Sequence, residues 1–231
     1  GAVGLDKTTA GTTTLSGTNT YTGTTTVSAG NLNLNSAGTA IAGNLTVAGG
    51  TATLQAADQI ADGKNVVVTS GTLDVASFND TVNGVQITGG TITGTTGALT
   101  STTAFDLQAG TVSAILGGTA GANKTTAGTV TLSKTNTYTG ATTVSAGTLT
   151  LGHATNTLAD ASTVVVSGGT LDLGGNADTV AGVQQTGGTI QNGTLTSTTA
   201  FDMQAGTASA NLAGAVGLDK TTAGTTTLSG T

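Results

Sequence analysis

The chain has 231 residues, a formal net charge of −6 at pH 7, only 7% charged and 2% aromatic residues, and neither Pro nor Cys. The absence of Cys excludes disulfides and thiolate metal sites, and five dispersed Lys cannot form the basic patch that a nucleic-acid partner would need. No apolar run approaches the ~20 residues of a membrane-spanning helix, so we expect no membrane insertion in this segment. Abundant Thr and Val, with no Glu or Arg, favour strands and turns over helices.

The N-terminal stretch Leu5–Leu34 recurs along the chain. It returns as Ala122–Leu151 and begins a third time at Leu218. The last eighteen residues, Gly214–Thr231, are identical to the first eighteen, Gly1–Thr18. The chain therefore consists of one long sequence period and the start of the next, as in a segment of a longer repetitive protein.

A shorter repeat of about 19 residues lies inside the long one, and each copy is marked by a Gly that precedes an alternating run. Alternation of apolar and polar residues, as in TLTL at 148–151, predicts a strand with one buried face. The marking glycines are Gly11, Gly30, Gly50, Gly71, Gly90, Gly110, Gly128, Gly147, Gly169, Gly188, Gly206 and Gly224. The side chains predicted to point inward include Leu32, Leu34, Leu73, Val75, Val130, Leu132, Leu149, Leu151, Leu171 and Leu173. The side chains predicted to point outward are Thr12, Thr51, Thr72, Thr91, Thr111, Thr129, Thr148, Thr170, Thr189, Thr207 and Thr225, with Asn31 at the remaining position.

Two short strands cannot bury their own apolar face, but stacked copies can, with each strand pairing to the coil on either side about 4.8 Å away. We therefore predict an all-β fold, a right-handed parallel β-helix (β-solenoid) of about twelve coils of roughly 19 residues each. Variable coil lengths favour this hand over left-handed solenoids with rigid coils. The predicted domain is one continuous solenoid over 1–231, with large repeat units at 1–117 and 118–213 and the start of the next period at 214–231.

The run LDKTTAGTTTLSGTNTYTGTTTVSAGNLNL at 5–34 resembles the autotransporter-associated β-strand repeat, and so does ANKTTAGTVTLSKTNTYTGATTVSAGTLTL at 122–151. The intervening coils match this repeat only in general style. The resemblance implies a right-handed β-helix in the passenger region of a large bacterial surface or secreted protein, acting as a stalk, fibre or adhesin shaft. It carries no catalytic residue onto this sequence.

The residues that could bind a metal ion or take part in catalysis are better interpreted as structural residues. His153, the only His, follows a strand in LGHATN, where we expect an exposed corner residue without metal or triad partners. Asp74 and Asp80 recur as Asp172 and Asp178, and each pair could hold Ca²⁺ across a corner, although a solvated Asp and a turn-forming Asp are the preferred interpretation.

Two further sets of residues are candidate functional residues. Asp106 and Asp202 are expected at corners, and Phe105 and Phe201, with Leu107 and Met203, are expected to fill the core of equivalent coils. A Thr-x-Thr ladder on the outer face would suit ice or glycan binding, but it follows the Gly in only half of the coils and is interrupted by Asn31, Asp74, Asp172 and Gln191. We predict no catalytic, cofactor-binding or metal-binding residue and no cofactor, and we predict that the chain is not an enzyme.

We therefore expect a structural shaft or fibre segment of a giant repetitive extracellular bacterial protein, located at the cell surface or secreted. Neither end of the sequence carries a polar cap, so each end should meet another copy of the same repeat, covalently or head to tail. The alternative function is a binding module that uses the Thr ladder against a glycan, a surface or ice.

Overall fold

The computed structural model describes residues 2–230, and in that range it contains strands and turns but no helix. None of the described residues therefore forms a helix that could span a membrane. The chain divides into two compact units: the first holds the residues up to 105 together with 109–117, and the second holds 106–108 and the residues from 118 onward. Strand β12 (Phe105–Leu107) belongs in part to each unit.

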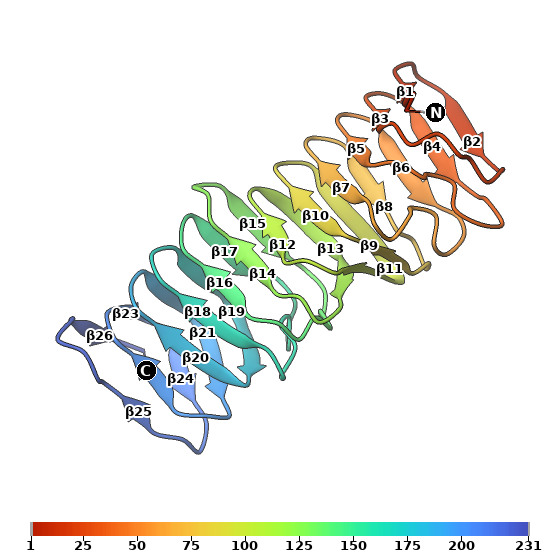
Figure 1. The fold of residues 1–231 in the computed structure, drawn as a ribbon. Coiled ribbons are helices and arrows are strands. Elements are labelled where there is room, and N and C mark those ends of the chain that lie inside the picture. The colour runs from red at the N-terminus through yellow and green to blue at the C-terminus, as the bar shows by residue number, and fades with distance from the viewer. Residues whose placement is uncertain (1, 231) are drawn as a thin grey trace. The chain divides into compact units, whose positions relative to one another are not determined.

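In the first unit, each coil gives its first strand to one parallel sheet and the strand after the marking Gly to another (Figure 1). The order of the first sheet is β1 (Leu5–Lys7), β3 (Thr25–Val27), β5 (Leu45–Val47), β7 (Asn65–Val68) and β10 (Gly84–Ile87). The order of the second is β2 (Thr12–Leu15), β4 (Asn31–Leu34), β6 (Thr51–Leu54), β8 (Thr72–Asp74), β11 (Thr91–Ser101) and β13 (Gly110–Gly117), and β9 (Asp80–Val82) pairs with the end of β11.

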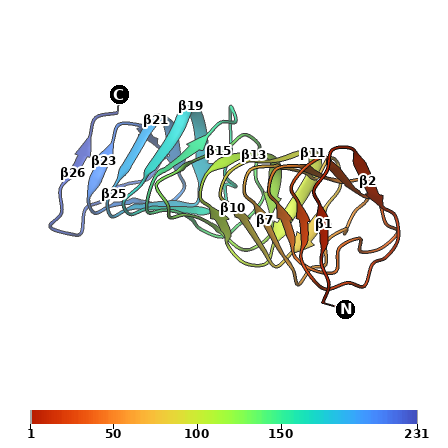
Figure 2. The same cartoon turned by 90° about the horizontal axis from the view of Figure 1, so that it is seen from above.

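The second unit repeats this arrangement. Its first sheet has the order β14 (Ala122–Lys124), β16 (Thr142–Val144), β18 (Thr163–Val166), β20 (Gly182–Gln185), β22 (Phe201–Met203) and β25 (Leu218–Asp219). Its second sheet has the order β15 (Thr129–Leu132), β17 (Thr148–Leu151), β19 (Thr170–Val180), β21 (Thr189–Ser197), β23 (Gly206–Ala208) and β26 (Thr226–Leu228), and β24 (Asn211–Ala213) pairs with β21. Figure 2 shows β19, β21, β23 and β26 following one another along one face.

The register places like residues over like. Leu149 lies opposite Val130 on one side and Leu171 on the other, and Thr148 lies opposite Thr170. All ten side chains predicted to point inward are no more than 1% exposed, and every predicted outward Thr is half-buried or exposed. These observations confirm the all-β parallel solenoid of about twelve turns; the right hand of the helix and the division into large repeat units stay predictions.

The core of each unit is aliphatic, with one bulky layer in each. Phe105 and Met203 are completely buried, Leu107 is 1% exposed and Phe201 is 4% exposed, so the prediction that these residues fill the core is confirmed. Phe105 packs closely within the core, whereas Phe201 also borders a hollow at the last described coil.

Candidate functional site

Among residues 2–230, no three His, Cys, Asp or Glu side chains lie close enough together to hold a metal ion. His153 lies in the loop between β17 and β18, as predicted, but it is half-buried rather than exposed. Its Nδ1 donates to the carbonyl oxygen of Thr155 at 2.6 Å, which makes it part of its own turn.

Asp74 and Asp172 form turns. The carboxylate of Asp74 accepts a hydrogen bond from the N–H of Ala76 at 2.9 Å, and that of Asp172 accepts one from the N–H of Gly174 at 2.8 Å. A carboxylate that accepts from the backbone two residues ahead fixes a tight turn. Asp74 and Asp172 are therefore the turn-forming residues of the two predicted pairs.

Asp80 and Asp178 are neither solvated nor in turns, which corrects the prediction. They lie on strands β9 and β19 and are 1% and 2% exposed. Burial raises the pKa of Asp80 to about 7 and that of Asp178 to about 6, against the lowering effect of their backbone hydrogen bonds. The sequence signal was available: in DTV, the Asp alternates with an inward Val and is therefore an inward residue itself.

Each of these two carboxylates holds the chain of the preceding coil. One oxygen of Asp80 accepts from the N–H groups of Gln59 and Ile60 at 2.9 and 3.1 Å. The matching oxygen of Asp178 accepts from the N–H groups of Thr157 and Leu158 at 2.8 and 3.1 Å. The other oxygen of each carboxylate is buried without a hydrogen-bond partner among the described residues. We assign both groups a structural role between coils.

Asp106 and Asp202 lie in the middle of strands β12 and β22, not at corners as predicted. Both point outward and are half-buried. Asp202 accepts hydrogen bonds from the amide groups of Gln184 at 2.7 Å and Gln204 at 2.8 Å, and these bonds lower the pKa of its carboxyl group. These carboxylates therefore belong to polar ladders on the outer face.

Two Lys side chains are buried, which the sequence analysis did not foresee. Lys7 is 6% exposed and Lys124 is fully buried. The Nζ of Lys7 donates to the carbonyl oxygen of Thr9 in its own coil and to that of Ala29 in the next coil, the latter at 3.2 Å. Lys124 repeats both bonds, to the carbonyl oxygens of Thr126 and, at 3.3 Å, Ala146.

The position of these Lys side chains follows from the strand register. Lys7 lies opposite Val27, and Lys124 lies opposite Val144, so each occupies an inward position that is apolar in the following coil. Burial lowers the pKa of Lys124, and the nearby charge of Asp106 opposes this shift. Aligning the Lys with the Val one coil later would have revealed its inward direction from the sequence.

The remaining polar residues of the long repeat also connect neighbouring coils. The amide of Asn19 donates to the carbonyl oxygen of Ala40, and the amide of Asn136 donates to that of Thr157, both at 2.8 Å. The hydroxyl groups of Tyr138 and Thr142 lie 2.9 Å apart in the core. The two Asn thus link neighbouring coils, whereas the Tyr–Thr pair is a contact within one coil.

Among the described residues of the second unit, one file of the outer Thr face is continuous. In the second unit, Thr148, Thr170, Thr189 and Thr207 lie opposite one another in successive coils. In the next file, Thr150 is followed by Asp172 and then by Gln191. The interruption that was predicted from the sequence is present in the structure.

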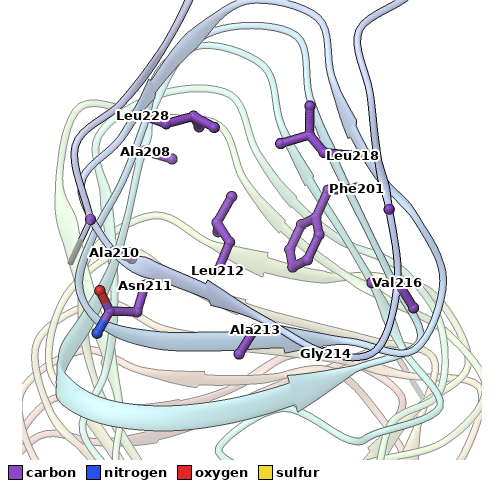
Figure 3. Close-up of a pocket in the computed structure, with 12 residues that line it drawn as sticks. Phe201, Ala208, Ala210, Asn211, Leu212, Ala213, Gly214, Val216, Leu218 and Leu228 are labelled. Atoms are coloured by element: carbon purple, nitrogen blue, oxygen red, sulfur yellow. The ribbon is translucent and has the colours of Figure 1, made fainter.

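The face of the last described coil is open in the structure. A hollow of about 370 Å³ opens there, lined mainly by apolar side chains. Leu228, Leu212, Phe201 and Leu218 point into it from different strands and turns (Figure 3). Leu218 is 42% exposed and Leu228 is 53% exposed. In the stack, apolar groups of this kind are covered by the next coil, as Val130 is by the coil of Leu149.

Comparison with known families gave a match to three segments, at residues 5–34, 123–151 and 145–173. The matching model is the passenger-associated-transport-repeat. The first two segments are those whose resemblance was noted from the sequence, so that resemblance is confirmed. The third segment was not predicted, because it lies in a coil that resembles the motif only in general style. No curated protein and no solved structure matches the chain.

The passenger-associated-transport-repeat segments contain the two buried Lys, the two Asn that bond to the next coil, and the two Tyr, each of which bonds to a Thr of its own coil. Other polar links between coils, such as those of Asp80 to Gln59 and Ile60, lie outside these segments. Together with the solenoid fold, this match fits a passenger segment of a secreted or cell-surface protein.

Proposed function

We propose that the chain is a non-catalytic shaft segment of an extracellular bacterial passenger protein, and that it continues end to end with further copies of the same repeat. The observation that carries this proposal is the use of its buried polar groups. Lys124, Asn136 and Asp178 each place hydrogen bonds on the backbone of a neighbouring coil. A catalytic site would direct such polar groups at a substrate. Here they form hydrogen bonds between neighbouring coils.

A shaft must resist local opening, because extracellular proteases cut chains that open transiently. The dry aliphatic core and the bonds between coils both oppose such opening. Because each coil contacts only its neighbours, stability accumulates along the stack and does not depend on a single centre.

The proposal is tested by digesting the folded chain and the urea-unfolded chain with proteinase K and following intact protein by mass spectrometry. We expect the folded chain to be cut at least ~100-fold more slowly, with early cuts confined to the outermost coils. Similar rates for the two states would contradict a shaft function.

A binding function along the Thr face has weaker support. Only the file that includes Thr148 and Thr170 is unbroken in the second unit, and a flat ligand surface would need a second file beside it. Asp172 and Gln191 occupy that place. We therefore keep the shaft as the proposed function.

A further inference from the structure

The second unit has a polar hollow near the point where the pairing of β19 with β21 shifts register. Its volume is about 630 Å³, and three successive coils line it. A further described coil follows these three, because β23 pairs with β26. The lining residues are Gly, Asn, Thr and Ser, so none of them carries an apolar or charged side chain. They include Gly174, Gly175, Asn192, Gly193, Thr194 and Asn211.

The first unit has larger side chains at the equivalent corner. The stretch VASFN at 75–79 corresponds to LGGNA at 173–177, so a Phe is replaced by an Asn, and an Ala and a Ser by two Gly. Ala76 and Gly174 both have a positive φ, of 50° and 62°, so the backbone turns in the same way in both units. Strand β21 has nine residues where β11 has eleven, so this corner is also two residues shorter. Smaller side chains and a shorter strand together account for the hollow.

Two side chains that lie opposite each other at this corner also become polar. In the first unit Ala98 lies opposite Ile115, and in the second unit Thr194 lies opposite Asn211. The flanking sequences, ALTSTTAF and TLTSTTAF, identify Ala98 and Thr194 as equivalent positions. The replacements lie in different coils that are neighbours in space, and together they make one continuous polar surface.

Asp172 lies beside the hollow and fixes two of its lining residues. Its carboxylate accepts a hydrogen bond from the N–H of Gly174 at 2.8 Å, and its two oxygens accept from the side-chain amide of Asn192 at 3.2 and 3.1 Å. The side-chain amide of Gln191 donates to the same carboxylate at 3.1 Å. Lining residues of neighbouring coils are therefore held in place before any ligand binds, which lowers the entropy cost of binding.

The groups in the hollow indicate the class of ligand. None of the lining residues is Lys or Arg, which disfavours a phosphate, sulfate or carboxylate ligand. The lack of apolar lining disfavours a lipid. Asp172 already accepts from three residues, and the described part of the chain has no cluster of metal ligands. Amide side chains both donate and accept hydrogen bonds, as do hydroxyl groups, so the lining suits a neutral ligand rich in hydroxyl groups.

We propose that this hollow binds a neutral saccharide, whose hydroxyl groups form hydrogen bonds with Asn192, Thr194 and Asn211. This binding function goes beyond the proposed shaft function and does not depend on it, because the hollow lies within one unit and its residues take no part in the core. The unbroken Thr file is not part of the site, since Thr148 and Thr170 do not line the hollow.

The proposal is tested by NMR titration of the isotope-labelled 231-residue chain. The probes are short neutral oligosaccharides of glucose, galactose, mannose and N-acetylglucosamine, and a polyuronate and a sulfated oligosaccharide serve as charged comparisons. We expect at least one neutral probe to give saturable shifts of the amide signals of Gly174, Gly175 and Gly193, and the charged probes to give none. Saturable shifts with the charged probes alone, or with no probe at all, would overturn the proposal.

The residues are tested with the double variant T194A/N211I. Both new residues occur at the equivalent positions of the first unit, so the fold accommodates them. We expect the Kd for the neutral probe to rise at least ~10-fold, because two hydrogen-bonding side chains are lost. N123A removes an exposed Asn of β14 outside the hollow and is the matched control, with an unchanged Kd. An unchanged Kd in a double variant with the original circular dichroism spectrum would overturn the assignment of these residues.

A second variant, N192G, tests the site without touching the residues that face each other across the corner. Asn192 has a φ of 57°, which Gly adopts without strain, so the variant removes the amide and leaves the turn in place. We expect the Kd for the neutral probe to rise at least ~3-fold. Full affinity in both N192G and T194A/N211I would place the saccharide elsewhere on the chain and overturn the proposal.

Discussion

The two complete copies of the long motif, Leu5–Leu34 in the first unit and Ala122–Leu151 in the second, share the hydrogen bonds of their Lys, Asn and Tyr side chains but differ in burial. The hydroxyl groups of Tyr21 and Thr25 lie 2.8 Å apart, and those of Tyr138 and Thr142 lie 2.9 Å apart. Yet Tyr138 is fully buried, whereas Tyr21 is only half-buried.

The reason lies in the neighbours of each copy. Both copies have a coil that follows them, and that coil receives the bonds from Lys7 and Lys124. The second copy is also contacted by residues that precede it, because the hydroxyl of Thr126 donates to the carbonyl oxygen of Gln108 at 3.0 Å. The motif sequence thus determines which of these hydrogen bonds form, whereas the number of neighbouring coils determines how deeply they are buried.

The largest expected difference between the copies concerns the tyrosines. Tyr138→Ala should lower the free energy of unfolding by roughly 3–5 kcal/mol because it leaves a cavity in a closed core, and Tyr21→Ala should lower it by about half as much. Urea denaturation followed by circular dichroism measures both values. The corresponding Phe variants separate the lost hydroxyl from the lost ring. Equal losses at the two positions would show that the neighbouring coils do not matter.

The buried carboxylates allow the two units to be compared by the pH dependence of their stability. Asp80 and Asp178 have folded pKa values of about 7 and about 6, above the ordinary value of 3.8. A group with a raised pKa binds its proton more tightly in the folded state, so stability should be highest near pH 4 and should fall as pH rises. The fall should end near pH 6 for Asp178 and near pH 7 for Asp80, with a total on the order of a few kcal/mol for each.

Urea denaturation between pH 4 and 8 tests this dependence. Asp80→Asn should remove the part of the slope that extends to pH 7, and Asp178→Asn should leave that part in place. Asp172→Asn, on the outer face, serves as the matched control for the substitution itself. Stability that rises from pH 4 to 7 would contradict the expected sign.

The smallest expected effects distinguish the three equivalent Lys. Lys124→Met should cost about 1.5–3 kcal/mol, because the carbonyl groups of Thr126 and Ala146 lose a charged donor in a buried place. Lys7→Met should cost less, since Lys7 keeps some exposure, and Lys220→Met should change stability by less than ~0.5 kcal/mol in the monomer. Thermal and urea unfolding at low protein concentration give this order, and an effect at Lys220 as large as that at Lys124 would break the comparison.

Much of the fold could be predicted from the sequence. Strict alternation in stretches such as TLTL at 148–151 fixed which residues face the core, and the repeated Gly located the turns. Repetition then implied stacking, because a coil of about 19 residues cannot bury its own apolar face. The aromatic layer at Phe105 and Phe201 followed from the same argument and is buried as expected.

The interpretation of polar residues was less successful, and the failures share one cause. Asp80 and Asp178 were assigned to solvent or to turns because charge favours the surface, and no prediction of burial was made for Lys7 and Lys124. Their positions within alternating strands pointed inward, and in each case the alternation proved correct. A charged residue in register with an apolar one in the next coil is therefore better interpreted as a buried link between coils.

The sequence by itself determined the repeat, the two strands of each coil, the inward and outward sets and the resemblance to a passenger repeat, because all of these depend on local periodicity. Only the tertiary structure decided which polar groups are buried and which backbone groups they bind. Burial depends on both neighbouring coils: Lys7 and Lys220 stand in identical sequences, yet the one under a following coil is buried and the other is exposed.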